Sequence, residues 1–261
     1  MLEALSTRWA GRGRVSYEAK MPSTNLRARE MARAGAPHGS LAVCDDQTAG
    51  RGRMQREWKT PPGLALTHSL VLRPKLSPQD AQLVTLAAAV ASAQAIEEVC
   101  PELRAGIKWP NDVLIGTRKC VGILCEVAME GDGLAYVIAG VGINVNQTSF
   151  PEELSGKATS LRIECGRETD RWSLLCAYLQ HMEDAVDALE ARGLPGILEA
   201  YTRRSVTLGQ TVRIVSPTES YVARACELDE TGALLVTDEQ GARRRVLCGD
   251  VSVRGLMGYC E

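Results

Sequence analysis

The order of hydrophobic and polar residues predicts alternating strands and helices from the start of the chain to about residue 205. Short runs of branched and apolar residues indicate strands, and apolar residues recurring at helical spacing indicate helices that pack on a sheet. The predicted strands cover residues 15–20, 40–46 and 64–72 and a strand-rich stretch over 106–146 with turns at 116–117 and 131–133. The predicted helices cover residues 23–35, 77–99, 170–192 and 194–205.

Two of these helices begin with residues that favour a helix start. Ser23 or Thr24 is expected to cap the first helix, because a short hydroxyl side chain can accept a free backbone N–H there. Ser77, Pro78 and Asp80 provide an N-cap, a proline at the first helical position and an acid in the first turn. We therefore expect the long apolar helix to begin at this point.

From about Val206 the chain changes to short alternating runs, each ended by glycine, proline or an acidic residue. The runs are residues 211–215, 221–229, 233–238, 243–248 and 251–255. This spacing is typical of a small antiparallel barrel of about 55 residues. We expect two domains, residues 1–205 and 206–261.

The composition is that of an ordinary soluble globular protein, with 45% hydrophobic and 24% charged residues. Lys and Arg number 30 and Asp and Glu 32, a formal net charge of −2. Since no general basic field is present to hold phosphates, DNA is not expected as a partner.

Nine cysteines occur without a CxxC pair, and the histidines are His38, His68 and His181. Neither a zinc site nor a disulfide framework is indicated, so free thiols in a reducing compartment are expected. The start of the chain has no signal-peptide core, and the apolar stretch 83–96 is shorter than the roughly 20 residues of a membrane span. We expect a cytoplasmic protein that does not bind a membrane.

Three clusters combine glycine with basic or amide residues between predicted strands. They are residues 47–58 (QTAGRGRMQREW), 108–112 (KWPND) and 118–124 (RKCVGIL). Backbone N–H groups near glycines, together with arginine and lysine, suit a phosphate-bearing ligand. Taken singly, each cluster is better explained as a surface loop, a turn or a surface charge.

In order, however, the motifs resemble those of the biotin protein ligases. They are STN (23–25), QTAGRGR (47–53) followed by Trp58, KWPND, RKCVGILCE (118–126) and GVGINV (140–145). The tail from LGQTVRI to LCGDVSVRG is similar to the small SH3-like barrel at the C-terminus of that family. No helix-turn-helix precedes residue 20, so the resemblance is to the monofunctional class without a DNA-binding domain.

The resemblance implies an α+β fold, in which helices pack on one face of a mixed or antiparallel central sheet. It implies that biotin and ATP react to biotinyl-5'-AMP and pyrophosphate, with Mg²⁺ on the pyrophosphate side, through protein ligands that the motifs do not identify. The biotinyl group then passes to a lysine of a biotin carboxyl carrier protein. A homodimer is implied by resemblance only.

The resemblance also implies roles for individual residues. Catalytic roles fall to Lys119, Arg53, Asp112 and Lys108, with Lys119 bridging carboxylate and α-phosphate and Asp112 orienting or deprotonating the acceptor lysine. The biotin-binding residues are Ser23, Thr24, Asn25, Gln47, Gly50, Arg51, Gly52, Arg53, Lys119, Gly122, Leu124 and Gly140. The residues for ATP and the adenylate are Arg51, Arg53, Arg56, Trp58, Lys108, Asn111, Lys119 and Asn144, with Trp58 stacking on adenine.

The pentapeptide AGRGR occurs twice, at residues 10–14 and 49–53. The first copy lacks a preceding amide and a following tryptophan, so we expect a surface leader. The second copy departs from the family, where the loop commonly continues with a glycine at the position of Gln55. If that glycine has a positive φ, Gln55 must adopt another turn or bear strain.

Two other functions are compatible with parts of the pattern. Lipoate ligases share the fold and the adenylation chemistry, but their loop is not GRGR followed by KWPND. A catalytically inactive adaptor or RNA-binding module could use Arg51, Arg53 and Arg56 as phosphate contacts, although the balanced charge argues against it.

Overall fold

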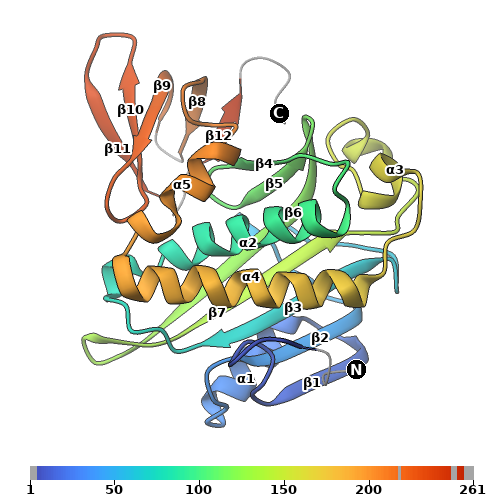
Figure 1. Ribbon diagram of the computed structural model, residues 1–261. Helices are drawn as coiled ribbons and strands as arrows, with labels where there is room; N and C mark the ends of the chain where they lie inside the picture. Colours follow the sequence, from blue (N-terminus) through green and yellow to red (C-terminus); the bar gives the residue numbers. More distant parts are fainter. Residues whose placement is uncertain (1–4, 217–218, 248–251, 256–261) are drawn as a thin grey trace.

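The computed structural model describes residues 5–216, 219–247 and 252–255, which form two β-sheets with helices around the larger one (Figure 1). The larger sheet has the strand order β1-β2-β3-β7-β6-β5-β4. Its strands are β1 (Val15–Met21), β2 (Ser40–Gln47), β3 (Ala65–Leu72), β4 (Ala105–Lys108), β5 (Asp112–Ile115), β6 (Arg118–Glu130) and β7 (Gly133–Asn144). β1 and β2 are parallel and the other neighbouring strands are antiparallel, so the expected mixed sheet is confirmed.

The long helices α2 and α4 lie across one face of this sheet, but α1 lies on the other face (Figure 1). The helices are α1 (Thr24–Arg33), α2 (Leu83–Val99), α3 (Leu161–Cys165), α4 (Arg171–Arg192) and α5 (Pro195–Arg204). Leu70 and Leu72 of β3 pack in the core under α2 and α4, whereas Val71 packs with Met31 of α1. The expectation that helices cover one face is therefore wrong for α1. Since β3 is buried along its whole length, it needs cover on both faces.

The predicted helix-start residues cap their helices only in part. The Ser77 hydroxyl accepts the N–H of Asp80 at 3.2 Å, yet this closes the 3-10 turn η3 (Pro78–Asp80), and α2 begins only at Leu83. Ser23 is the N-cap residue of α1, but its side chain makes no capping hydrogen bond. The first turn of α1 is joined to β2 instead, because the Thr24 N–H donates to the side chain of Gln47.

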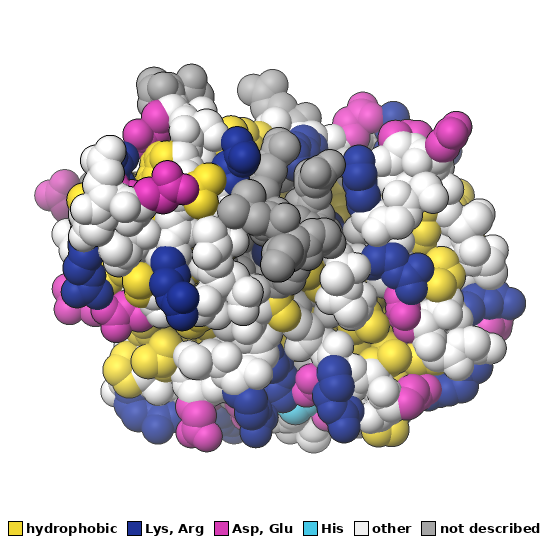
Figure 2. Space-filling view, turned by 90° about the horizontal axis from the view of Figure 1, so that it is seen from above, with side chains coloured by type: hydrophobic (Ala, Val, Ile, Leu, Met, Phe, Trp, Pro, Cys, Tyr) yellow, Lys and Arg dark blue, Asp and Glu magenta, His cyan; other side chains and the backbone are white. Residues whose placement is uncertain are grey.

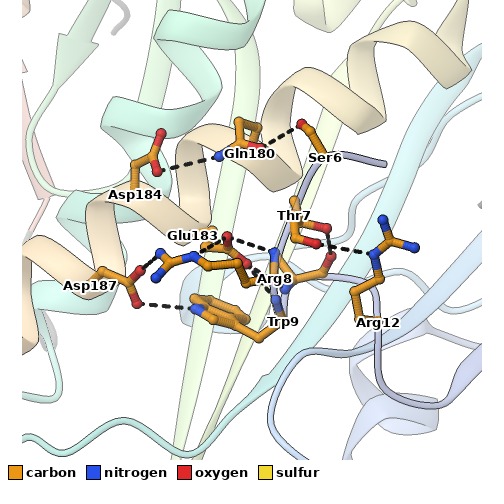
Figure 3. A network of polar contacts seen from close by, with 10 residues as sticks. Ser6, Thr7, Arg8, Trp9, Arg12, Gln180, Glu183, Asp184 and Asp187 are labelled. Carbon is orange, nitrogen blue, oxygen red and sulfur yellow. Dashed lines mark hydrogen bonds and ion pairs between the residues drawn. The ribbon is translucent and has the colours of Figure 1, made fainter. Parts of the chain in front are cut away.

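The first AGRGR copy is packed into the domain, so the expected surface leader is wrong. Glu183 of α4 accepts the backbone N–H groups of Arg8, Trp9 and Ala10 at 2.8, 2.6 and 3.0 Å (Figure 3). Burial opposes ionisation of Glu183, but these N–H groups and the Arg8 side chain outweigh it and lower the pKa of the carboxyl. Ala10 is fully buried, and Gly11 adopts a φ of +72°. This copy serves to hold the N-terminal segment against α4.

The C-terminal region forms a separate antiparallel sheet in the order β11-β10-β9-β8-β12. Its strands are β8 (Thr211–Val215), β9 (Ser220–Leu228), β10 (Leu234–Asp238), β11 (Arg243–Val246) and β12 (Ser252–Gly255). The Trp109 indole donates to the carbonyl of Gly232 at 3.1 Å, which docks the β9–β10 turn on the larger domain. The predicted antiparallel strands are confirmed where described. Cys248 and Val251, at the ends of the last two predicted runs, lie outside the described residues, and the boundary at 205/206 stays a prediction.

The cysteines, the helices and the surface charges can each be compared with the composition. Seven of the nine cysteines lie in the described part of the chain, and all seven are free. Within the same part, no helix is both long and apolar enough to cross a membrane. Lysine and arginine side chains are interspersed with acidic ones on the face shown in Figure 2.

Candidate active site

A cavity on the α1 face of the large sheet collects most of the predicted site residues. The predicted residues that line it are Ser23, Thr24, Asn25, Gln47, Arg51, Gly52, Arg53, Trp58, Asn111, Lys119, Gly122, Leu124 and Gly140. They come from the start of α1, from the end of β2 and the loop that follows it, from the turn between β4 and β5, and from strands β6 and β7. The face opposite α2 and α4 is therefore where the separate motifs meet.

Strand alternation in β6 decides which side chains reach this cavity. Val121 and Ile123 are buried in the core under α2 and α4, so Gly122 and Leu124 face the other side of the sheet. Lys119 would face away from Gly122 in a regular strand, because the two residues are three positions apart. The register between β5 and β6 shifts there, which leaves Cys120 as an extra residue. This β-bulge turns Lys119 toward the cavity.

The bulged Cys120 itself is structural. It is fully buried, and burial raises the pKa of its thiol far above the usual range. The backbone N–H and carbonyl of its neighbour Lys119 both form hydrogen bonds with the segment 157–159. The Lys119 N–H donates to the carbonyl of Lys157 at 2.8 Å, and its own carbonyl accepts the Thr159 N–H at 2.9 Å.

Glycines form the cavity floor and Trp58 lies on it. Gly122 of β6 and Gly142 of β7 are cross-strand partners. A Cβ on Gly142 would lie 2.5 Å from the Trp58 ring, and one on Gly140 would lie 1.8 Å from the side chain of Asn25. The floor therefore has to be glycine for the indole and the amide to approach the sheet. The Trp58 Nε1 is buried and has no hydrogen-bond partner among the described residues, so it is a donor available to a bound molecule.

Beside this floor runs a series of hydrogen-bonded side chains that we call the polar chain: Gln47, Thr24, Ser69, Asn25 and Glu126. The Thr24 N–H donates to Gln47 Oε1 at 2.8 Å. Ser69 Oγ lies 2.8 Å from Thr24 Oγ1 and 2.7 Å from Asn25 Oδ1. Because a carbonyl oxygen can only accept, Ser69 donates its single proton to Asn25. The Asn25 Nδ2 group then donates to Glu126 Oε2 at 2.9 Å.

The glycine loop is folded as a small hairpin beside the cavity. The Trp58 N–H donates to the carbonyl of Gly50 at 3.0 Å, and the Gly52 N–H donates to the carbonyl of Arg56 at 2.7 Å. At the tip, the 3-10 turn η2 (Arg53–Gln55) contains Met54 with a φ of 54°. The left-handed residue of this loop is Met54, whereas the sequence directed attention to Gln55.

Three cations of the site each have a polar partner within the protein. The Lys119 Nζ lies 2.6 Å from Asp112 Oδ1. The Arg53 Nη1 donates to Asn111 Oδ1 at 2.8 Å, and the Arg51 Nη2 lies 3.5 Å from Glu126 Oε1. Converging cations whose partners a ligand can displace suit a ligand that carries a carboxylate and phosphates.

Comparison with known proteins agrees with this arrangement. The model of the biotin/lipoate A/B protein ligase family matches residues 17–144, and the biotin protein ligase C-terminal domain matches residues 207–254. The bifunctional ligase/repressor BirA of Bacillus subtilis is 38% identical over 87% of this chain and 70% of its own length. The chain belongs to the biotin protein ligase family.

Two further family members extend the comparison. The biotin--[acetyl-CoA-carboxylase] ligase of Mycobacterium tuberculosis is 33% identical over 93% of this chain and 90% of its own length. The structure of a biotin protein ligase from Aquifex aeolicus in complex with biotin and ATP is similar with a TM-score of 0.78 and 27% identity. That likeness covers 93% of this chain and 99% of the Aquifex chain.

Five predicted residues of this family member do not line the cavity. Gly50 contributes backbone to the hairpin, and Arg56 is exposed. Lys108 is buried with 8% exposed. The Asn144 side chain accepts a hydrogen bond from Gln147 at 3.0 Å, and Asp112 reaches the site through Lys119.

Five residues that the structure places at the site were not predicted from the sequence. Ile123, Val141 and Gly142 line the cavity, and Ser69 and Glu126 belong to the polar chain. A signal was present for four of them, since Ile123 and Glu126 stand inside the motif at 118–126 and Val141 and Gly142 inside the motif at 140–145. Ser69 sits in an apolar strand and carries no local signal.

Proposed function

We propose that this chain is an ATP-dependent biotin protein ligase. It forms biotinyl-5'-AMP and pyrophosphate from biotin and ATP, and then transfers the biotinyl group to a lysine of a biotin carboxyl carrier protein. The observation that carries this proposal is the convergence, in one cavity, of Lys119, Arg51 and Arg53 with the Gln47, Thr24 and Asn25 members of the polar chain. Membership of the family and the likeness to the Aquifex enzyme support it.

The first step requires a carboxylate to attack an α-phosphate although both are negatively charged. Fixed cations at the meeting point lower this barrier, because charge that develops there is stabilised without reorganising solvent. Lys119 suits this role, since backbone bonds on both sides and the bulge at Cys120 fix its position. When the two anions arrive, they replace Asp112 as partners of the ammonium group.

The ends of the cavity suit the two halves of the intermediate. Ser23, Thr24, Asn25 and Gln47 provide donors and acceptors for the ureido ring of biotin, over a floor of Gly122, Leu124 and Gly140. Gly50, Arg51 and Gly52 bring the loop backbone and a cation to the junction. We assign the nucleotide to Arg51, Arg53, Trp58 and Asn111 of the cavity, and to Arg56, Lys108 and Asn144 outside its lining. Trp58 would move from the glycine floor to stack on adenine.

Mg²⁺ fits as a companion of the triphosphate rather than as a resident metal. No group of three or more metal-ligating side chains occurs among the described residues. Mg²⁺ commonly keeps its waters and binds substrate phosphates with few protein ligands. Its contribution would be to neutralise the pyrophosphate that leaves.

The same proposal includes the setting in which the enzyme works. The acceptor is a biotin carboxyl carrier protein or domain, and neither DNA nor a membrane takes part. We also propose a cytoplasmic location, which the free thiols support, and a homodimer, which rests on the resemblance alone.

Pyrophosphate release without an acceptor tests the first step. The protein is incubated with ATP, Mg²⁺ and either biotin or lipoate. We expect release with biotin and none above background with lipoate. Release with lipoate alone would assign the chain to the lipoate ligases, and no release with either would favour the adaptor function.

A further inference from the structure

Glu126 joins three parts of the site through one carboxylate. It stands on β6 and faces the same side of the sheet as Gly122 and Leu124, because these residues precede it by four and two positions. Its Oε2 accepts the Nδ2 group of Asn25 at 2.9 Å. Its Oε1 pairs with Arg29 of α1 and lies 3.5 Å from Arg51 of the glycine loop.

The Asn25 amide has its donor end committed to β6. One Nδ2 hydrogen goes to Glu126 and the other to the carbonyl of Leu124 at 3.2 Å. A flipped amide would direct its carbonyl oxygen at a carboxylate and a carbonyl, two repulsive contacts in a partly buried place. Glu126 therefore fixes which end of Asn25 faces Ser69 and the floor at Gly140.

The fixed orientation presents an acceptor to the cavity. Asn25 Oδ1 has two lone pairs and accepts one hydrogen bond from Ser69, which leaves one lone pair for a ligand N–H. We propose that Glu126 is a positioning residue that selects ligands with a ring N–H by holding Asn25 as an acceptor. This inference rests on the proposed function, in which the N–H belongs to the ureido ring of biotin.

Two arginines, Arg29 and Arg51, pair with Glu126, and they allow its positioning role to be distinguished from simple charge pairing. Arg51 is 41% exposed and 3.5 Å away, so its pair contributes little. Arg29, on α1, is the closer counter-ion. It contacts the carboxylate of Glu126 without lining the cavity. Loss of Arg29 should leave the bond from Asn25 to Glu126 in place.

The test compares Glu126→Gln with the matched variant Arg29→Gln. Calorimetry measures the dissociation constants of biotin and of the cyclic carbamates in which oxygen replaces one ureido N–H. In Glu126→Gln the amide of Asn25 can flip, because glutamine offers a donor where the carboxylate offered only acceptors. We expect biotin to bind roughly 5-fold to 150-fold more weakly, the factor for a buried N–H donor left without its acceptor. Preference for biotin over the carbamates should fall toward one, with the KM for ATP changed less than about threefold.

A second variant tests the role even if Glu126→Gln folds poorly. In the double variant Asn25→Asp with Glu126→Gln, the glutamine can donate to the new carboxylate, which again presents an acceptor to the cavity. We expect it to regain preference for biotin relative to Asn25→Asp alone, in which two carboxylates face each other. Unchanged biotin affinity in Glu126→Gln, an equal loss in Arg29→Gln, or no regain in the double variant would each overturn the inference. A wild-type protein that released no pyrophosphate with biotin would instead contradict the proposed function itself.

Discussion

The ammonium group of Lys119 lies 2.6 Å from the carboxylate of Asp112, across neighbouring strands of the large sheet. The bulge at Cys120 produces this contact by turning Lys119 onto the face of Asp112 and Gly122. Asp112 can thus act on the first step through Lys119, in addition to the role toward the acceptor lysine that the sequence suggested.

Substitutions at this pair separate the two roles of Asp112. Lys119→Ala should lower biotin-dependent pyrophosphate release roughly 100-fold to 1,000-fold, the usual effect of removing one group that stabilises developing charge. Asp112→Asn should lower release at least as strongly as it lowers transfer from preformed biotinyl-5'-AMP. Lys59→Ala, at an exposed position beyond the loop, serves as control. A loss confined to transfer would assign Asp112 to the acceptor lysine alone.

Gly140 and Gly133 stand on the same strand and form a matched pair. A Cβ on Gly140 would lie 1.8 Å from Asn25, whereas one on Gly133 would approach only a carbonyl at 3.5 Å. Gly140→Ala should therefore destabilise the fold by roughly 1–3 kcal/mol and abolish measurable biotin binding, because Asn25 must move. Gly133→Ala should change neither. Thermal unfolding and calorimetry with biotin measure both effects, and equal behaviour of the two variants would contradict the floor described here.

Met54 carries the left-handed backbone of the glycine loop, so its replacement should alter loop order. Glycine removes the roughly 1–2 kcal/mol that a side chain costs in this conformation. Met54→Gly should stabilise the hairpin and slow the release of biotinyl-5'-AMP, measured by chase with unlabelled biotin. Gln55→Gly should have a smaller effect. A larger effect of Gln55→Gly than of Met54→Gly on this release rate would place the backbone strain at Gln55 instead.

His68 should make stability depend on pH. It is fully buried beside Tyr178, and burial lowers its pKa from 6.5 to about 3. The unfolded chain therefore binds a proton that the folded chain does not, and the free energy of unfolding falls as the pH drops from 6.5. Between pH 6.5 and roughly pH 5 this group should remove about 2 kcal/mol. Urea unfolding should show a shallower pH slope in His68→Leu, and identical slopes would contradict the assignment.

Much of the site could be predicted because its motifs are local in sequence. Gln47, Trp58, Lys119 and Gly140 stand in short runs whose glycines and cations already indicate an anionic ligand. The ion pair of Lys119 could not be predicted, because it depends on a bulge that places one extra residue in β6. Alternation counted from the sequence would place Lys119 on the wrong face.

Other features depend on partners far apart in the chain. The first AGRGR copy looked like a free leader because its partner Glu183 lies on α4. Ser69 looked like one more residue of a buried strand, although it links Thr24 to Asn25. The packing of α1 on the second face likewise depends on β3 being buried on both of its faces. The sequence of β3 alone does not distinguish burial on both faces from burial on one face.

Mass measurement of an acceptor tests the proposed ligase activity most directly. A biotin carboxyl carrier domain is incubated with the protein, ATP, Mg²⁺ and biotin, and peptide mapping locates any added mass. We predict one biotinyl group on a single lysine of the carrier, formed with ATP and absent when ATP is omitted. A carrier that stays unmodified while a positive-control ligase modifies it would contradict the proposal.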